Sequence, residues 1–186
     1  MEALLRLGAF MAILLLMVGW EFFRPMRQAR QSRRQRWPVN LGLAAFNMLV
    51  MRFSIGSAAW LAAQWAAEQH LGLFNRLPIP VELNIAGSLL LLDLAIYAQH
   101  VAAHRWLWFW RLHQVHHSDL DFDTTTAVRF HPLEIMLSML YKVTVVILVG
   151  PTPDTVIAFE IILNGCALFN HGNVSLTPRV ERVLRN

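Results

Sequence analysis

The sequence predicts an all-α integral membrane protein with about four or five apolar helical segments and one histidine-rich face. Three observations lead to this fold class. The chain is 56% hydrophobic with a mean hydropathy of +0.43, which is too apolar for a soluble globule of this size. Its apolar stretches are long enough to cross a bilayer. Five of its eight histidines fall within 18 residues, at spacings that place imidazoles side by side on a helix.

The first apolar stretch runs from Leu4 to Phe23 and is long enough to span about 30 Å of hydrocarbon. We interpret it as a membrane anchor rather than a signal peptide, because no small-residue cleavage site precedes the arginines that follow it. Those arginines form a basic segment, residues 24–38. The positive-inside rule predicts that this segment is a cytoplasmic loop touching anionic lipid head groups. No nucleic-acid partner is expected, since no recognition motif surrounds the arginines.

Further apolar stretches cover residues 41–67, 83–103, 133–149 and 155–169. The last two are joined by a proline-containing reversal, residues 151–154, and are expected to form a helical hairpin. If the basic segment is cytoplasmic, this order of crossings brings the end of the third stretch and the end of the hairpin to the cytoplasmic side. We therefore expect an integral membrane protein with a cytoplasmic histidine-rich face, in a bacterial inner membrane.

The histidines form two groups that are typical of metal ligands. His100 and His104, at the end of the third stretch, project from one edge of a helix. By the same spacing rule His113, His116 and His117 cluster on one helical face. Neutral imidazole binds zinc, copper, iron and nickel, and the chain has one cysteine, so the pattern indicates a nitrogen-ligated metal centre. A run of interfacial histidines that only solvates helix ends is the alternative.

Other residues near these histidines are candidates for supporting roles. Tryptophans between the two groups are expected to form an interfacial belt, with substrate contact as the second interpretation: Trp106, Trp108 and Trp110. Residues that could orient a ligand histidine through a hydrogen bond are His131, Asp93, Asp119 and Asp123. For Asp93 the alternative to orienting a histidine is a polar contact between neighbouring helices, which we call a polar seam. For Asp119 and Asp123 a solvated acidic loop is the default interpretation. For His131, which precedes a helix start, we favour a structural or orienting role over ligation.

Three further residues have expected positions. Lys142 and Glu160 lie in opposite arms of the predicted hairpin, where charged groups are costly, and they could pair with each other. His70 falls on the opposite side of the membrane by the order of crossings and should not belong to the site.

The residues around the histidines resemble a known family. Leu112–Ser118 and its continuation to Glu134 resemble the second histidine box of the fatty acid hydroxylase/sterol desaturase superfamily. His100 and His104 resemble the first box, and residues 170–173 resemble the start of the third region. The resemblance implies O2-dependent hydroxylation or desaturation of a lipid C–H bond at a non-haem di-iron centre. The two iron ions would be held by His100, His104, His113, His116, His117 and His171, with no other catalytic residue.

The sequence departs from that family in one respect. The family's pattern ends with another H-x-x-H-H box, which residues 1–186 do not contain. We therefore expect one membrane-embedded domain over residues 1–186 that lacks its C-terminal histidine box, and a fragment that is inactive by itself. No flavin, haem or iron–sulfur motif is visible, so electrons are expected from an external cytochrome or ferredoxin. The alternatives are a catalytically inactive membrane scaffold, or pseudoenzyme, and a haem- or metal-binding electron carrier.

Overall fold

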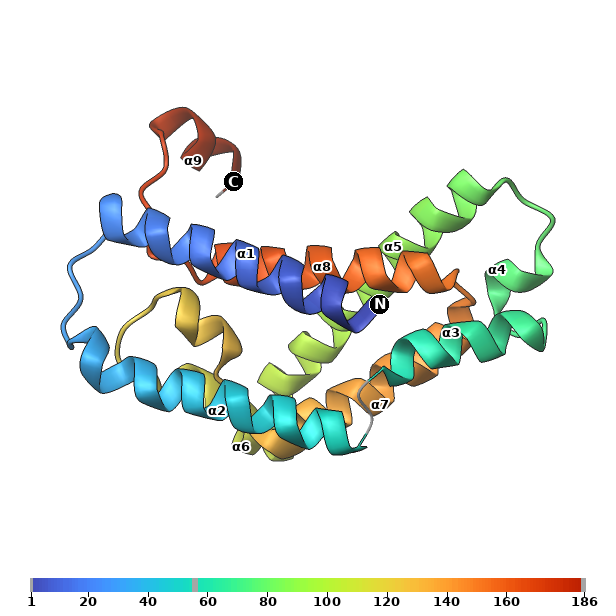
Figure 1. Ribbon diagram of the computed structural model, residues 1–186, viewed down its shortest axis with the longest axis horizontal. Helices are drawn as coiled ribbons and strands as arrows, with labels where there is room; N and C mark the ends of the chain where they lie inside the picture. The colour runs from blue at the N-terminus through green and yellow to red at the C-terminus, as the bar shows by residue number, and fades with distance from the viewer. Residues whose placement is uncertain (1, 55–56, 185–186) are drawn as a thin grey trace.

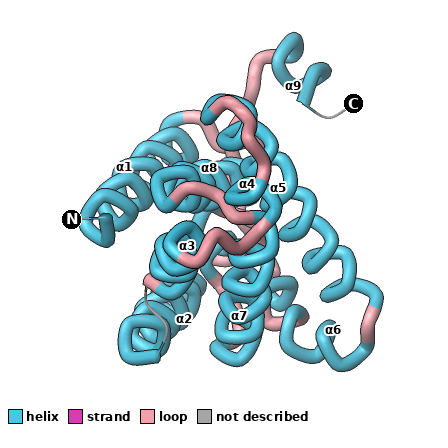
Figure 2. Tube along the Cα trace, turned by 90° about the vertical axis from the view of Figure 1, so that its right-hand side faces the viewer, coloured by secondary structure: helices cyan, strands magenta, loops and turns pink. Residues whose placement is uncertain are grey.

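A computed structural model describes residues 2–54 and 57–184, and within these residues the regular elements are helices without a strand. The all-α prediction is confirmed for this part of the chain. The elements are α1 (Glu2–Phe23), α2 (Arg33–Ser54), α3 (Ala58–Glu68), α4 (Leu73–Arg76), α5 (Val81–Arg105), α6 (Leu107–His113), the 3-10 turns η1 (His116–Ser118) and η2 (Thr124–Val128), α7 (Pro132–Val149), α8 (Pro153–Asn170) and α9 (Pro178–Leu184). The short α9 stands apart from the other helices (Figures 1 and 2).

Three of the described helices are long and apolar enough to cross a membrane: α1, α5 and α7. They have 22, 25 and 18 residues, which at 1.5 Å per residue corresponds to lengths of about 27–38 Å. Only 6–11% of each apolar window is buried inside the protein, so most of these apolar side chains point outward. Apolar helices with outward-facing side chains are typical of membrane spans.

The second apolar stretch is not one helix, which corrects the prediction of a single segment over residues 41–67. The helix α2 begins at Arg33, inside the expected basic loop, and α3 is a separate helix. Residues 55 and 56 lie outside the described residues. The early start of α2 has a physical reason: Arg36 and Asn40, in its first two turns, are buried against a later loop. In Figure 1, α2 and α3 follow one another along the lower edge, so together they still lead from one end of the molecule to the other.

The chain reverses between α7 and α8 at the predicted turn, but the two helices diverge from it, and α3 and α5 pack against both (Figure 1). Gly150 ends α7 with a left-handed backbone (φ 71°), and Thr152 caps α8 by accepting a hydrogen bond from the Thr155 N–H at 3.2 Å. Gly72 packs against Gly150, where an added Cβ would lie 2.6 Å from the Gly150 Cα. We call this end of the molecule the turn end. His70 lies next to the turn end. Because α8 runs from this end to His171, its 18 residues place the two histidines about 27 Å apart.

The helices α1 and α8 lie side by side and run parallel (Figures 1 and 2). The Glu160 carboxylate, on α8, accepts hydrogen bonds from Lys142 at 2.9 Å and from Arg6 of α1 at 2.5 Å. The predicted pairing of Lys142 with Glu160 is therefore confirmed, and Arg6 joins it. Arg6 also pairs with Glu2 at 2.5 Å, so two cations and two carboxylates neutralise one another between the helices.

Small residues hold the helices close together around α3. Ala59, Ala63 and Ala66 have no exposed surface, and the first two pack in one cluster with Leu92 of α5 and Val146 of α7. Small side chains allow helix backbones to approach closely, which is a common form of packing between membrane helices. A second cluster brings together α1, η2, α8 and the segment after His171: Leu14, Met17, Ala127, Leu168 and Val174.

Candidate metal centre

The first histidine group combines the end of α5 with the end of α6. His100 and His104 lie one turn apart on α5, and their Nε2 atoms are 3.2 Å apart. His113 is the last residue of α6, and its ring centroid lies 4.9 Å from that of His100 and 4.8 Å from that of His104. Each of the three offers a ring nitrogen, and these atoms all lie within 4.8 Å of one another.

The second box does not lie on one continuous helix, which corrects the expectation of a single helical face. The helix α6 ends at His113, and His116 and His117 follow in the separate turn η1. The three rings are nevertheless adjacent, with centroids 4.9–5.3 Å apart. His113 and His116 are buried, whereas His117 is exposed. The turn therefore keeps the box together and leaves one imidazole on the open side.

The second histidine group joins residues that are far apart in the sequence. His171 follows the last residue of α8, and its Nε2 lies 2.8 Å from the Nε2 of His116. His117 lies between the two groups, with its ring centroid 4.9 Å from that of His104 and 5.0 Å from that of His116. All six histidines that the sequence singles out therefore lie in one cluster, whereas His70 lies at the turn end.

Backbone carbonyls fix the proton positions in the second histidine group. The Nδ1 atom of His116 faces the Arg129 carbonyl at 3.3 Å, and that of His171 faces the Ala167 carbonyl at 2.8 Å. Because a carbonyl only accepts, each Nδ1 carries the proton and each neutral ring keeps its lone pair on Nε2. Burial, and then the nearby His171 and His113, lower the pKa of His116 to about 3, and burial lowers the pKa of His171. The two lone pairs thus converge, which is unfavourable unless a cation binds between them.

In the first histidine group a carboxylate orients the buried ring. The Nδ1 atom of His113 lies 2.6 Å from Oε1 of Glu134, in the first turn of α7. The opposite atom, Nε2, is buried and has no hydrogen-bond partner among the described residues. A histidine that gives one N–H to a carboxylate and presents its other nitrogen is the usual form of an oriented metal ligand. This role of Glu134 was not predicted from the sequence; the available signal was its place in the stretch, residues 112–134, that resembles the second box.

The donor set fits a metal of intermediate softness. The ligand candidates are imidazole nitrogens without a thiolate, a set that suits iron, copper, nickel or zinc. Two nitrogens bound to one ion at about 2.1 Å are themselves roughly 3 Å apart, close to the spacings of 3.2 Å and 2.8 Å observed within the two groups. The first group is a candidate site for one ion, because its three ring nitrogens lie within 4.8 Å of one another, and the His117 ring lies beside both groups.

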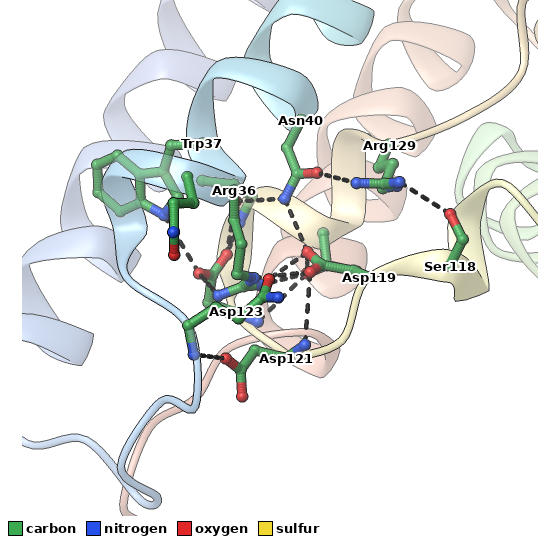
Figure 3. A network of polar contacts seen from close by, with 12 residues as sticks. Arg36, Trp37, Asn40, Ser118, Asp119, Asp121, Asp123 and Arg129 are labelled. Carbon is green, nitrogen blue, oxygen red and sulfur yellow. Dashed lines mark hydrogen bonds and ion pairs between the residues drawn. The ribbon is translucent and has the colours of Figure 1, made fainter.

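The acidic residues after the second box do not contact the histidines, and they are not a solvated loop. Asp119 and Asp123 are almost completely covered and pair with Arg36 of α2 at 2.6 Å and 2.7 Å (Figure 3). Asn40 and Thr126 also donate hydrogen bonds to Asp119. Burial alone raises the pKa of Asp119, but the hydrogen bonds and charge of Arg36 outweigh it and hold that pKa well below its usual range. This finding also corrects the expectation that Arg36 touches lipid head groups.

Arg129 links the second box to α2. Its guanidinium donates to Oδ1 of Asn40 at 2.9 Å and to Oγ of Ser118 at 2.8 Å (Figure 3). It also donates to the Val115 carbonyl at 2.9 Å. The carbonyl of Arg129 itself is the partner of His116. The position of His116 therefore depends on a long-range polar network, which the sequence pattern did not reveal.

Glu21 supports the other side of the second histidine group. It lies near the end of α1 with no exposed surface. Its Oε1 accepts hydrogen bonds from the backbone N–H and hydroxyl of Thr124 and from the backbone N–H of Asn173, each at 2.7 Å. Asn173 follows His171 by two residues, so Glu21 fixes the segment that carries this histidine. This role of Glu21 was not predicted from the sequence, although a carboxylate in an apolar anchor is an unusual feature that could have indicated it.

Two candidates for orienting a histidine lie outside the cluster. His131 caps α7, where its Nδ1 accepts a hydrogen bond from the Leu133 N–H at 3.2 Å. Its role here is structural, one of the two roles favoured from the sequence. Asp93 is exposed on α5 and forms no hydrogen bond or ion pair with the residues that the structure describes. The polar seam considered for Asp93 is therefore not formed within this part of the chain.

The tryptophans divide into two kinds. Trp106 and Trp108 are 55% and 57% exposed and stack with Phe109, as expected of side chains at a membrane interface. Trp110 is half-buried, and its ring lies 5.6 Å from the rings of both His104 and His117. Trp110 is thus the tryptophan that borders the histidine cluster.

The fold and the site define a helical membrane protein with a polyhistidine centre suited to metal binding. The family model for fatty acid hydroxylase matches residues 85–186, which is more than half of the chain. The chain therefore belongs to the fatty acid hydroxylase family, which confirms the resemblance found in the sequence. This membership implies an oxidoreductase that hydroxylates or desaturates lipids. No curated protein and no solved structure matches the chain significantly.

Proposed function

We propose that the protein catalyses O2-dependent hydroxylation or desaturation of a lipid C–H bond at a di-iron centre held by its six clustered histidines. The observation that carries this proposal is the pairing of His116 with His171. Their Nε2 atoms, whose lone pairs point toward each other, lie 2.8 Å apart. The buried, unpaired Nε2 of His113 supports a second ion in the first histidine group. The converging lone pairs of the second histidine group and the unpaired nitrogen of the first favour binding of a cation at each group.

Iron bound at such a centre would supply O2 activation for attack on an unactivated C–H bond. The protein's own residues hold the ligand nitrogens in place. Glu134 keeps the proton of His113 on Nδ1, and the Arg129 and Ala167 carbonyls do the same for the second histidine group. The exposed imidazoles of His100, His104 and His117 leave one side of the cluster accessible to a lipid chain.

Each turnover needs two electrons and two protons besides O2. Hydroxylation leaves one oxygen atom in the product and releases the other as water, whereas desaturation releases both oxygen atoms as water. We propose that an external cytochrome or ferredoxin supplies the electrons. We also propose that the histidine cluster lies on the cytoplasmic side of the membrane. The arginines that precede α2 support this orientation, since positively charged loops are retained on the cytoplasmic side.

The proposal is tested by turnover of the protein purified from its native membrane, with iron(II), a reducing system, labelled O2 and a panel of lipids. The expected product carries a labelled hydroxyl group or has lost two hydrogen atoms. His113→Ala and His117→Ala should abolish turnover and leave membrane insertion unchanged, whereas His70→Ala, at the turn end, should retain activity. Undiminished turnover in either cluster variant would rule out the ligand assignment. A Soret band in the purified protein would instead indicate a haem carrier.

A further inference from the structure

A cleft of about 590 Å³ lies beside the histidine cluster. Three segments form its walls: residues 26–30 with Arg33 and Arg36 at the start of α2, residues 119–123 after the second box, and Asn170, Gly172 and Asn173 at the end of α8. The third segment flanks His171, which does not itself line the cleft, and Phe122 of the second segment stacks on the His171 ring. The cleft therefore borders the second histidine group.

The carboxylates that line this cleft are already engaged. Asp119 and Asp123 pair with Arg36, and Asp121 accepts a hydrogen bond from the Gln31 N–H at 2.7 Å (Figure 3). On the opposite wall, the guanidinium groups of Arg27 and Arg30 are exposed and have no hydrogen bond or ion pair with the described residues. The charge that remains available in the cleft is therefore positive.

Apolar side chains connect this positive charge to the histidines. Leu120 and Phe122 line the cleft and are 71% and 53% exposed. The ring of Phe122 stacks on the imidazole of His171, with a centroid distance of 5.0 Å and an interplanar angle of 23°. A molecule with an anionic group at the arginines would place its adjoining apolar part on Phe122, one ring away from the second histidine group.

We propose that this cleft binds the anionic head group, a carboxylate or a phosphate, of the lipid on which the protein acts. This inference rests on the proposed function and narrows its substrate class to anionic lipids. Arginine suits the role because its planar guanidinium donates two parallel hydrogen bonds to a carboxylate or phosphate. Arg27 and Arg30 would bind the head group, and Leu120 and Phe122 would contact the beginning of the chain.

The first test measures binding in uncharged detergent, with radiolabelled oleate, lysophosphatidic acid and the neutral lipid monoolein as probes. We expect at least one anionic lipid to bind about tenfold or more tightly than monoolein, and Arg27→Gln/Arg30→Gln to remove that preference. Arg27→Lys/Arg30→Lys should recover part of it, because charge returns without the paired hydrogen bonds. The matched control is Arg105→Gln/Arg111→Gln, which changes two exposed arginines outside the cleft and should bind like the wild type.

Three binding results would overturn the proposal. The first is a cleft variant that keeps the preference for anionic lipid. The second is an equal loss in the control variant, which would indicate general attraction to a charged surface. The third is inorganic phosphate that competes as strongly as the lipid, which would indicate a site for a free anion.

A second test separates this inference from the proposed function. Iron content is measured in the same preparations, because the exposed arginines do not contact the histidines. In the wild-type protein, normal iron content without a preference for anionic lipid would contradict the proposed head-group cleft and leave the proposed function standing. A preserved lipid preference without bound iron would contradict the proposed function alone.

With an active preparation, the cleft variant should raise KM for the anionic lipid about tenfold while kcat stays within about twofold; an unchanged KM would contradict the assignment.

Discussion

The Glu134 carboxylate is predicted to set the affinity of the first histidine group for metal. It lies 2.6 Å from Nδ1 of His113, a residue that is only 1% exposed. The change Glu134→Gln keeps a carbonyl oxygen that can accept the same hydrogen bond but removes the negative charge. The change Glu134→Ala leaves the buried N–H without an acceptor.

The expected magnitudes follow from that difference. Removing the group that orients a metal-bound histidine typically weakens metal binding by 10–100-fold. We expect Glu134→Gln to raise the dissociation constant about tenfold, which is about 1.4 kcal/mol. Glu134→Ala should approach about a hundredfold, or about 2.7 kcal/mol, because the Nδ1 proton of His113 then loses its partner altogether.

The assay is a titration of the metal-free protein with iron(II) in detergent, in competition with a coloured chelator. Glu82→Gln is the matched control. Glu82 occupies the first turn of α5 as Glu134 occupies the first turn of α7, so both changes remove the same favourable interaction with a helix N-terminus. Equal affinities in the wild type and both Glu134 variants would refute the orienting role. Equal weakening in the Glu82 control would refute the interpretation that contact with His113 is responsible.

Three other predictions follow from the polar contacts. Arg36→Ala should lower the free energy of unfolding by about 3–5 kcal/mol, because two buried carboxylates lose their partner, whereas Arg34→Ala, exposed on the same helix, should change it by less than about 0.5 kcal/mol. Because the pKa of Asp119 is lowered in the folded state, this stabilisation is complete above the unfolded pKa of about 3.9 and is lost as the pH falls below it. The Tm difference between wild type and Arg36→Ala should therefore be constant from pH 7 to about 4 and shrink in stronger acid; a difference that grows in acid would contradict this reasoning. Glu160→Gln should lower Tm more than Lys142→Met does, since it leaves two cations without their shared carboxylate; the reverse order would argue against the network. His116→Ala and His171→Ala should each reduce bound iron from two ions per chain to one, as measured by metal analysis, and a ratio that stays at two would contradict the second histidine group.

The helices that could be predicted are those with a strong local signal. The apolar run that starts at Leu4 and the two arms of the predicted hairpin are visible because their lengths match a membrane and because proline or glycine marks their ends. The meeting of His171 with the two boxes could also be anticipated, since the order of crossings fixes which ends of the helices share a side. Neither inference requires knowledge of side-chain contacts.

The features that could not be predicted depend on residues far apart in the chain. Arg36 looked like a lipid anchor because it lies among other arginines, yet its partners Asp119 and Asp123 lie more than 80 residues away. Glu21 and Thr124, which are joined by hydrogen bonds, likewise lie 103 residues apart in the chain. A local pattern reports charge and periodicity, but it does not report which buried cation neutralises which carboxylate.

The central claim is that the histidine cluster binds two iron ions, and the most direct test is the metal content of the protein purified from its native membrane. Metal analysis combined with Mössbauer spectroscopy should find two non-haem iron ions per chain in nitrogen-rich coordination, and both should be absent when all six cluster histidines are replaced by alanine. A protein that binds no iron when it is isolated and reconstituted with iron(II) would contradict the account.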